Sequence, residues 1–176
     1  CDQGRILQQQ QRKPNDAVRT LVSVTPAGYL RLEEIRKDLA SNDRVFVAMW
    51  FDASMDKPYD EGLHLGIRNA GYTPVRLDRE PAHGDRIDAK IIVEIRRSRA
   101  LVVDATELRP NVMYEAGFAD GLGLPVIWTV RKDFVDKLPF DTRQLLHVCW
   151  ETPADLAEQL RWIVEQRLGS RNRKQL

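Results

Sequence analysis

Cysteine is scarce in this chain, and long apolar runs are absent. The two cysteines, Cys1 and Cys149, stand far apart among 176 residues, so neither a disulfide framework nor a cysteine-based metal site is indicated. So little cysteine is typical of a reducing compartment, and we expect a cytoplasmic location. No run of about 18 apolar residues is present, so the sequence predicts no membrane-spanning helix and no membrane partner.

The chain also lacks an excess of charge of either sign. Its 27 basic and 26 acidic side chains leave a formal net charge of +1, which is too small to attract nucleic acid through a general field. A basic tail over residues 169–176 carries Arg171, Arg173 and Lys174, and such an end is more often a solvated terminus than a binding site. We therefore expect no nucleic-acid partner.

Two common phosphate-binding loops are missing as well. The sequence contains neither a Gly-x-Gly-x-x-Gly segment nor a Gly-Lys-Ser/Thr ending, which argues against a dinucleotide fingerprint and a Walker-type NTPase. The three histidines, His64, His83 and His147, form no cluster with metal-ligand spacing. We expect neither a bound cofactor nor a metal ion.

The composition divides the chain into three parts. We interpret residues 1–43 as a linker or the end of a preceding module, with one helix that starts at Thr25-Pro26 and carries an apolar stripe that includes Leu32. Because the first residue is Cys rather than Met, we expect a longer protein. Residues 44–168 form the predicted α/β nucleotide-binding domain, and residues 169–176 are the basic tail.

Apolar segments of strand length alternate with amphipathic segments throughout the middle part. This alternation predicts parallel strands joined by right-handed crossovers, with helices on both faces of the sheet. We predict an open, mainly parallel five-stranded sheet of the Rossmann or flavodoxin-like type, with strand order 2-1-3-4-5. The predicted strands are 44–50, 72–77, 99–104, 125–130 and 145–150.

Polar and aromatic side chains follow these strands and should share one edge of the sheet, because parallel strands end on the same side. Carboxylates, cations and aromatic rings together suit a sugar held by hydrogen bonds and a base stacked on a ring. The sequence therefore predicts a nucleotide-sized pocket. Its candidate residues are Trp50, Phe51, Asp52, Asp78, Asp104, Thr106, Asn111 and Arg131.

Several of these residues have a structural alternative. Asp104 ends a strand, where an acid either holds a sugar or caps the next loop. Trp50 and Phe51 either stack a base or belong to the core or an interface. Asn111 lies in a first helical turn, from which its amide reaches a ligand or only solvent.

Glu115 is the carboxylate of greatest interest. It lies about one and a half turns into a helix that starts at Pro110, and helical side chains lean back toward the N-terminus, so it can reach the predicted pocket. Its neighbours Tyr114, Ala116 and Phe118 provide a partly apolar setting, which raises the pKa of a carboxyl group. The alternative is an ordinary surface glutamate near the positive end of the helix dipole.

The segment 102–127 resembles the nucleoside 2-deoxyribosyltransferase superfamily. The resemblance lies in Asn111, then Tyr114-Glu-Ala-Gly117, then Gly123-Leu-Pro-Val-Ile127, and it extends more loosely over residues 44–150. It is closer to a branch that looks like TIR-like or deoxyribosyltransferase-like nucleotide-binding domains of bacterial multidomain proteins. Some relatives in this branch are implicated in degrading nucleotides or NAD during phage defence.

The resemblance implies a reaction at the N-glycosidic bond of a nucleoside, nucleotide or NAD. Glu115 would be the nucleophile that attacks the anomeric carbon, and Asp104 and Asp88 would be candidates for the further acids of the family. The Gly-rich phosphate turn of the family's monophosphate hydrolases is absent, since Trp50-Phe51-Asp52 stands at that place.

Two alternatives to an enzyme stay open at this point. One is a catalytically silent nucleotide-sensing module that regulates another part of the protein. The other is a homo-oligomerising interaction domain, since relatives build active sites from two chains. We expect a homo-oligomer in either case, with Phe118 as a candidate interface residue.

Overall fold

A computed structural model describes residues 7–8, 23–77 and 87–171, and it divides the chain into two compact units, residues 1–42 and 43–176. In the first unit, β1 (Leu7–Gln8) pairs antiparallel with β2 (Ser23–Val24). Helix α1 (Pro26–Ser41) follows.

The start of α1 agrees with the sequence prediction. The backbone N–H of Gly28 donates to the Thr25 hydroxyl at 3.2 Å, so Thr25 caps the helix ahead of Pro26. The predicted apolar stripe is not covered at Leu32, a residue that is 44% exposed. A large part of the Leu32 surface therefore remains accessible.

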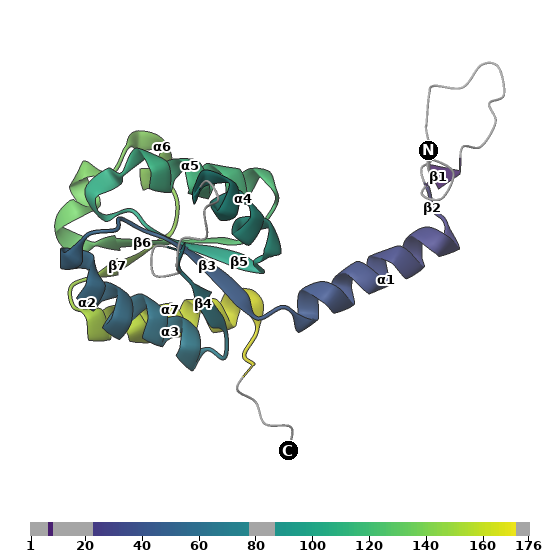
Figure 1. Cartoon of the computed structure of the whole chain (residues 1–176), viewed down its shortest axis with the longest axis horizontal. Helices are drawn as coiled ribbons and strands as arrows, with labels where there is room; N and C mark the ends of the chain where they lie inside the picture. The colour runs from purple at the N-terminus through teal and green to yellow at the C-terminus, as the bar shows by residue number, and fades with distance from the viewer. Residues whose placement is uncertain (1–6, 9–22, 78–86, 172–176) are drawn as a thin grey trace. The chain divides into compact units, whose positions relative to one another are not determined.

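The second unit contains the predicted sheet. Five strands, all paired in parallel, lie in the order β4-β3-β5-β6-β7, which is 2-1-3-4-5 by order along this unit (Figure 1). The α/β fold class and the strand order are therefore confirmed. The strands are β3 (Arg44–Ala48), β4 (Thr73–Val75), β5 (Ala100–Asp104), β6 (Val126–Arg131) and β7 (His147–Trp150).

Helices cover both faces of this sheet. Figure 1 shows α2, α3 and α7 on one face and α4 and α5 on the other. The α-helices are α2 (Asp56–Pro58), α3 (Leu65–Asn69), α4 (Ile87–Arg97), α5 (Pro110–Gly121), α6 (Phe140–Arg143) and α7 (Pro153–Leu168). A π-helix (Tyr59–His64) joins α2 to α3, and 3-10 turns span Ala53–Met55, Thr106–Leu108 and Lys132–Lys137.

The alternation of side chains along β3 builds the two cores. Val45 and Val47 pack into the cluster that includes α3 and α7, whereas Phe46 and Ala48 pack into the cluster that includes α4 and α5. A strand covered on both faces reads as a continuous apolar run, which is how β3 appears in the sequence.

Two glycines let the first crossover approach α7 closely. A Cβ atom at Gly62 would lie 2.8 Å from the Leu156 side chain, and one at Gly66 would lie 2.8 Å from the backbone oxygen of Ala157. These glycines therefore fix the distance between the helical segment after β3 and α7.

The winding of the chain reverses between β3 and β5. The chain leaves β3 for helices on one face and leaves β5 for α5 on the other, so the carboxyl ends of these two strands lie between elements that diverge. In open α/β sheets, ligands bind at such a reversal. Residues 49–52 and 105–115 border it.

Candidate functional site

Glu115 lies on the face of α5 that packs toward the sheet. Val112, Ala116 and Ala119 share this face and are buried, so Glu115 is the polar member of an apolar stripe. Only 4% of the residue is exposed. Burial raises the pKa of its carboxyl from the ordinary value of 4.5 to about 7.

No hydrogen-bond donor or cation within residues 7–8, 23–77 and 87–171 contacts the Glu115 carboxyl. Buried carboxyl groups are normally paired or hydrogen-bonded, because desolvation otherwise penalises them. The sequence predicted a partly apolar setting from Tyr114, Ala116 and Phe118; the setting is apolar, but Tyr114 is 66% exposed and Val112 and Ala119 supply the burial instead. A carboxyl in this condition can accept a hydrogen bond or a positive charge from a ligand.

Arg109 and Trp50 form a stacked pair at the start of α5. The guanidinium carbon of Arg109 lies 3.8 Å from the centre of the Trp50 ring, which is the geometry of a cation–π contact. The Nε atom of Arg109 is buried and has no hydrogen-bond partner in the described part of the chain. Trp50 thus holds the cation in place while the guanidinium N–H groups keep their capacity to bind an acceptor.

The N-terminus of α5 adds to the positive character of this region. Arg109 occupies the N-cap position without a side-chain cap hydrogen bond, Pro110 follows at the first helical position, and the first turn contains no acidic residue. Free N–H groups and the helix dipole favour an anion at such an end.

Asp52, a predicted substrate-binding residue, is occupied locally. Its carboxylate accepts hydrogen bonds from the Ser54 backbone at 3.0 Å and the Ser54 hydroxyl at 2.7 Å, which caps the following 3-10 turn. These bonds to Ser54, and then the nearby charge of Arg109, lower the pKa of Asp52. Asp52 therefore lies near the stacked pair and keeps a negative charge.

Phe51 is held from one side by a buried arginine. The guanidinium of Arg76, at the end of β4, lies 5.4 Å from the Phe51 ring centre and 4.6 Å from that of Tyr59, and it pairs with Asp56 at 3.4 Å. Phe51 itself is 37% exposed, so part of its ring can meet a ligand. Tyr59 is buried in the core.

Asp104 serves the architecture. The residue is 1% exposed, and its carboxylate accepts from the Thr106 backbone at 3.0 Å, the Thr129 hydroxyl at 2.8 Å and the Trp150 indole N–H at 3.1 Å. Burial raises the pKa of Asp104, and the hydrogen bonds oppose that rise. These contacts tie the ends of β5, β6 and β7 together, which favours the structural alternative over sugar binding.

Thr106 and Arg131 are both engaged by other residues of the chain. Thr106 is buried, and its hydroxyl accepts a hydrogen bond from the Arg131 backbone at 3.0 Å. The Arg131 guanidinium pairs with Asp133 through bonds of 2.6 and 3.1 Å. Its positive charge is therefore balanced by a neighbour.

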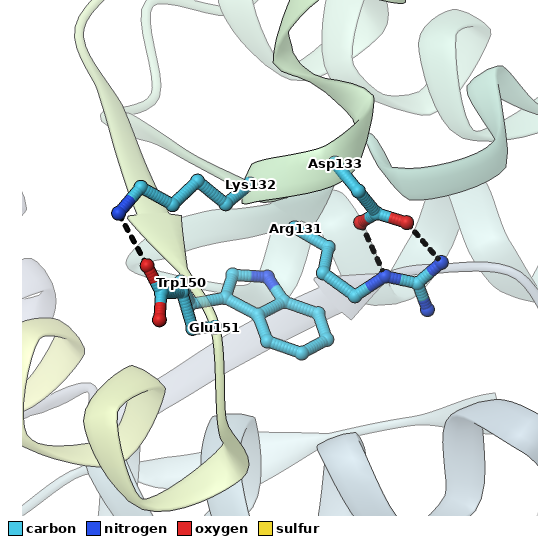
Figure 2. A pocket seen from close by; sticks show the side chains of 5 residues that line it. All are labelled: Arg131, Lys132, Asp133, Trp150 and Glu151. Atoms are coloured by element: carbon cyan, nitrogen blue, oxygen red, sulfur yellow. Dashed lines mark hydrogen bonds and ion pairs between the residues drawn. The ribbon is translucent and has the colours of Figure 1, made fainter.

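Arg131 lines a separate pocket at the carboxyl ends of β6 and β7. This pocket, about 470 Å³ in volume, is not lined by Glu115. Figure 2 shows the Trp150 ring between two ion pairs, Arg131 with Asp133 and Lys132 with Glu151. Because each cation faces a carboxylate, the pocket offers little net charge to a ligand.

The loop between β5 and α5 contains two strained residues. Glu107 has φ of 67° and Leu108 has φ of 51°, in the left-handed region that residues other than glycine rarely adopt. Backbone strain of this kind concentrates at functional sites. The loop lies between the anchored Thr106 and the stacked Arg109.

The remaining predicted residues contribute less to the described geometry. Asn111 is exposed in the first turn of α5. Asp78 lies outside the described residues, and so does the side chain of Asp88 at the start of α4. No group of His, Cys, Asp or Glu within the described ranges is arranged to hold a metal ion, and none of the helices in those ranges has the length and apolar character to cross a bilayer.

Sequence reasoning missed Arg109 and Arg76. The signal for Arg109 is its place immediately before Pro110, since the residue before a proline at the first helical position is the N-cap. Arg76 gave no signal, because an arginine next to a strand is normally exposed and this one is buried by aromatic rings from other elements.

No protein-family model matches the chain, and no curated protein matches it. Among solved structures, the chain is similar to the C-terminal domain of glucosamine-fructose-6-phosphate aminotransferase from Francisella tularensis, with 14% sequence identity and a TM-score of 0.35. The match covers 80% of this chain and 38% of that chain, and at this level of likeness it carries no argument about activity.

Proposed function

We propose that the chain cleaves or transfers the N-glycosidic bond of a nucleoside, nucleotide or NAD, with Glu115 as the attacking carboxylate. The observation that carries this proposal is the buried Glu115 carboxyl, which has a pKa of about 7 and no partner in the described part of the chain. The buried residues that share its helix face, Val112, Ala116 and Ala119, are all apolar. A role in binding or catalysis would explain a carboxyl with a raised pKa at this buried position.

The reaction divides one difficult displacement into two steps. A Glu115 oxygen bonds to the anomeric carbon while the C–N bond breaks, and the bonding pair leaves with the base, which takes a proton from an acid or from water. Water or a second base then attacks the same carbon and releases the carboxylate. The positive charge that develops on the sugar favours the ionised carboxylate in the transition state.

The stacked Arg109 favours a phosphorylated substrate. Its guanidinium, the uncapped N-terminus of α5 and the absence of acids in the first turn favour an anion, and the nearby Asp52 carboxylate opposes part of this field. Position 115 lies six residues further along the helix, or about 9 Å along its axis, and its side chain leans back toward that end. A sugar at Glu115 would thus have its phosphate on the Arg109 side.

Base release from nucleosides, nucleoside monophosphates and NAD tests the proposal, with Glu115→Gln as the inactivated variant and Asp120→Asn, the same carboxyl-to-amide change at an exposed position of α5, as its matched control. We expect Glu115→Gln to abolish release and Asp120→Asn to leave it unchanged. The value of kcat/KM should rise with pH through about 7. Equal activity of the two variants would remove Glu115 from the mechanism.

A further variant separates binding from chemistry. Arg109→Met should raise KM for nucleoside monophosphates and leave KM for the parent nucleosides unchanged, because only the former carry the anion. Arg109→Lys keeps a charge but lacks the planar group that stacks on Trp50, so we expect an intermediate effect.

A second candidate is a nucleotide-sensing module without turnover. The observation in its favour is that Asp104, the predicted second acid, is committed to three hydrogen bonds that join strands. In that case, calorimetry detects nucleotide binding that Arg109→Met weakens, and no base is released. A panel of nucleotides with no binder would count against both candidates.

A further inference from the structure

The outer face of α7 carries a ridge between two grooves. One groove, about 510 Å³, lies against α3 and includes Glu61 and Leu65. The other, about 430 Å³, lies against β7 and includes Leu146 and Trp162. Glu158 and Arg161 line both grooves, so they form the ridge that separates them.

Large apolar side chains are exposed beside this ridge. Leu146 is 69% exposed and Trp162 is 56% exposed, and both line the groove next to β7 together with Ile163. Tryptophan in such a setting is the residue most enriched at the energetic centre of protein interfaces. The α7 face is therefore suited to a protein partner.

The neighbouring sheet edge is closed to an added strand. The carbonyl oxygens of Leu145 and Cys149 on the β7 side accept hydrogen bonds from His147 Nδ1 at 2.8 Å and from Gln159 Nε2 at 3.2 Å. The chain's own side chains thus occupy acceptors that an added strand would need. These contacts favour a partner that binds helix side chains instead.

We propose that α7 forms the interface of a symmetric dimer with a second copy of this chain. An isologous interface needs a surface that is complementary to itself, and the α7 face has both a ridge and grooves that can receive one. Its ridge also carries one acid and one base, three residues apart. Across a two-fold axis, antiparallel α7 helices bring Glu158 of one copy opposite Arg161 of the other, twice.

A partner of strong charge fits this face less well. Glu158, Arg161 and Glu165 are mixed in sign, and Arg161 already contacts Glu165 at 3.1 Å within the helix. The formal charge of the whole chain is +1, so two copies repel each other little. The proposal is independent of any reaction at Glu115.

Sedimentation of the whole chain over a range of concentrations tests the interface. We expect a mass of two chains for the wild type. Glu158→Arg alone or Arg161→Glu alone should raise the dissociation constant at least about tenfold, because like charges then face each other twice. The double variant Glu158→Arg/Arg161→Glu should restore the dimer, because opposite charges then face each other again across the axis.

Trp162→Ala provides a second test that does not depend on charge, and it should also weaken the dimer at least about tenfold. Leu122→Ala, at an exposed apolar residue at the end of α5, serves as the control and should leave the mass unchanged. Circular dichroism establishes that each variant is folded. A wild-type monomer at every concentration, or a dimer that ignores the single charge reversals, would overturn the proposal.

Discussion

Replacing Glu115 with glutamine should stabilise the protein, and the gain should depend on pH. The carboxyl has a pKa of about 7 in the folded protein against 4.5 as its ordinary value. A carboxyl whose folded pKa is raised destabilises the fold as pH rises: the penalty is absent well below 4.5, grows between 4.5 and 7, and is constant above 7. The difference between the two pKa values corresponds to about 3 kcal/mol at full ionisation.

Chemical denaturation of both proteins at pH 5 and pH 8 measures this penalty. The glutamine amide does not titrate, so its own burial contributes equally at both pH values. We expect the free energy of unfolding of Glu115→Gln, relative to the wild type, to increase by about 2 kcal/mol from pH 5 to pH 8. The informative quantity is the change between pH 5 and pH 8 in the difference between the two free energies of unfolding, rather than that difference at one pH.

Asp120→Asn makes the same carboxyl-to-amide change at an exposed position of α5 and should alter stability by no more than about 0.5 kcal/mol at either pH. If the difference between Glu115→Gln and the wild type were the same at both pH values, the carboxyl would be solvated or paired in the folded protein. The physical case for Glu115 as a functional residue would then fail.

Three other predictions concern stability and are measured by urea denaturation. Gly66→Ala should destabilise the protein by about 1–3 kcal/mol, because its Cβ would lie 2.8 Å from a backbone oxygen of α7. Its control, Gly117→Ala, has open space around it in α5 and should stabilise the protein by up to about 1 kcal/mol. Glu107→Gly should be neutral or stabilise by up to about 1 kcal/mol, because glycine relieves the left-handed strain; Glu158→Gly, in a regular helix, should destabilise by about 1 kcal/mol. Asp104→Ala should destabilise by about 3 kcal/mol or more, since it leaves the buried Thr106 backbone N–H and the Trp150 indole N–H without their acceptor, whereas the Thr129 hydroxyl still has the Val103 carbonyl oxygen. A Gly66→Ala protein as stable as the wild type would contradict the close approach of this segment to α7. A Glu107→Gly protein destabilised as much as Glu158→Gly would contradict the backbone strain at Glu107. An Asp104→Ala protein of wild-type stability would contradict the structural role of Asp104.

The sheet could be predicted because its determinants are local. Continuous apolar runs such as Val45–Ala48 indicate strands covered on both faces, and the start of α5 at Pro110 follows from the conformation of proline. The burial of Glu115 was only partly predicted. The sequence indicates an apolar setting from Tyr114, Ala116 and Phe118, whereas the buried residues that share its helix face are Val112, Ala116 and Ala119.

The role of Asp104 could not be predicted in this way. Its partners Thr129 and Trp150 lie 25 and 46 residues further along the chain, on strands that meet only in the folded sheet. The stacking of Arg109 on Trp50 likewise joins segments 59 residues apart in number. Polar contacts of this kind depend on strand register and loop geometry, which a hydrophobic pattern does not encode.

Ligand binding and turnover should depend on pH in opposite directions, because they favour different protonation states of Glu115. An anionic phosphate held by Arg109 lies near this carboxyl and raises its pKa further, so binding of a nucleoside monophosphate should take up protons near pH 7 and should tighten as pH falls. A cationic sugar in the transition state has the reverse effect, so turnover should quicken as pH rises. Calorimetry in buffers of different ionisation enthalpy measures the uptake directly. Proton uptake on binding, together with a turnover rate that rises through pH 7, indicates an enzyme. Proton uptake without turnover indicates a nucleotide sensor. If no protons are taken up, the phosphate does not bind near Glu115.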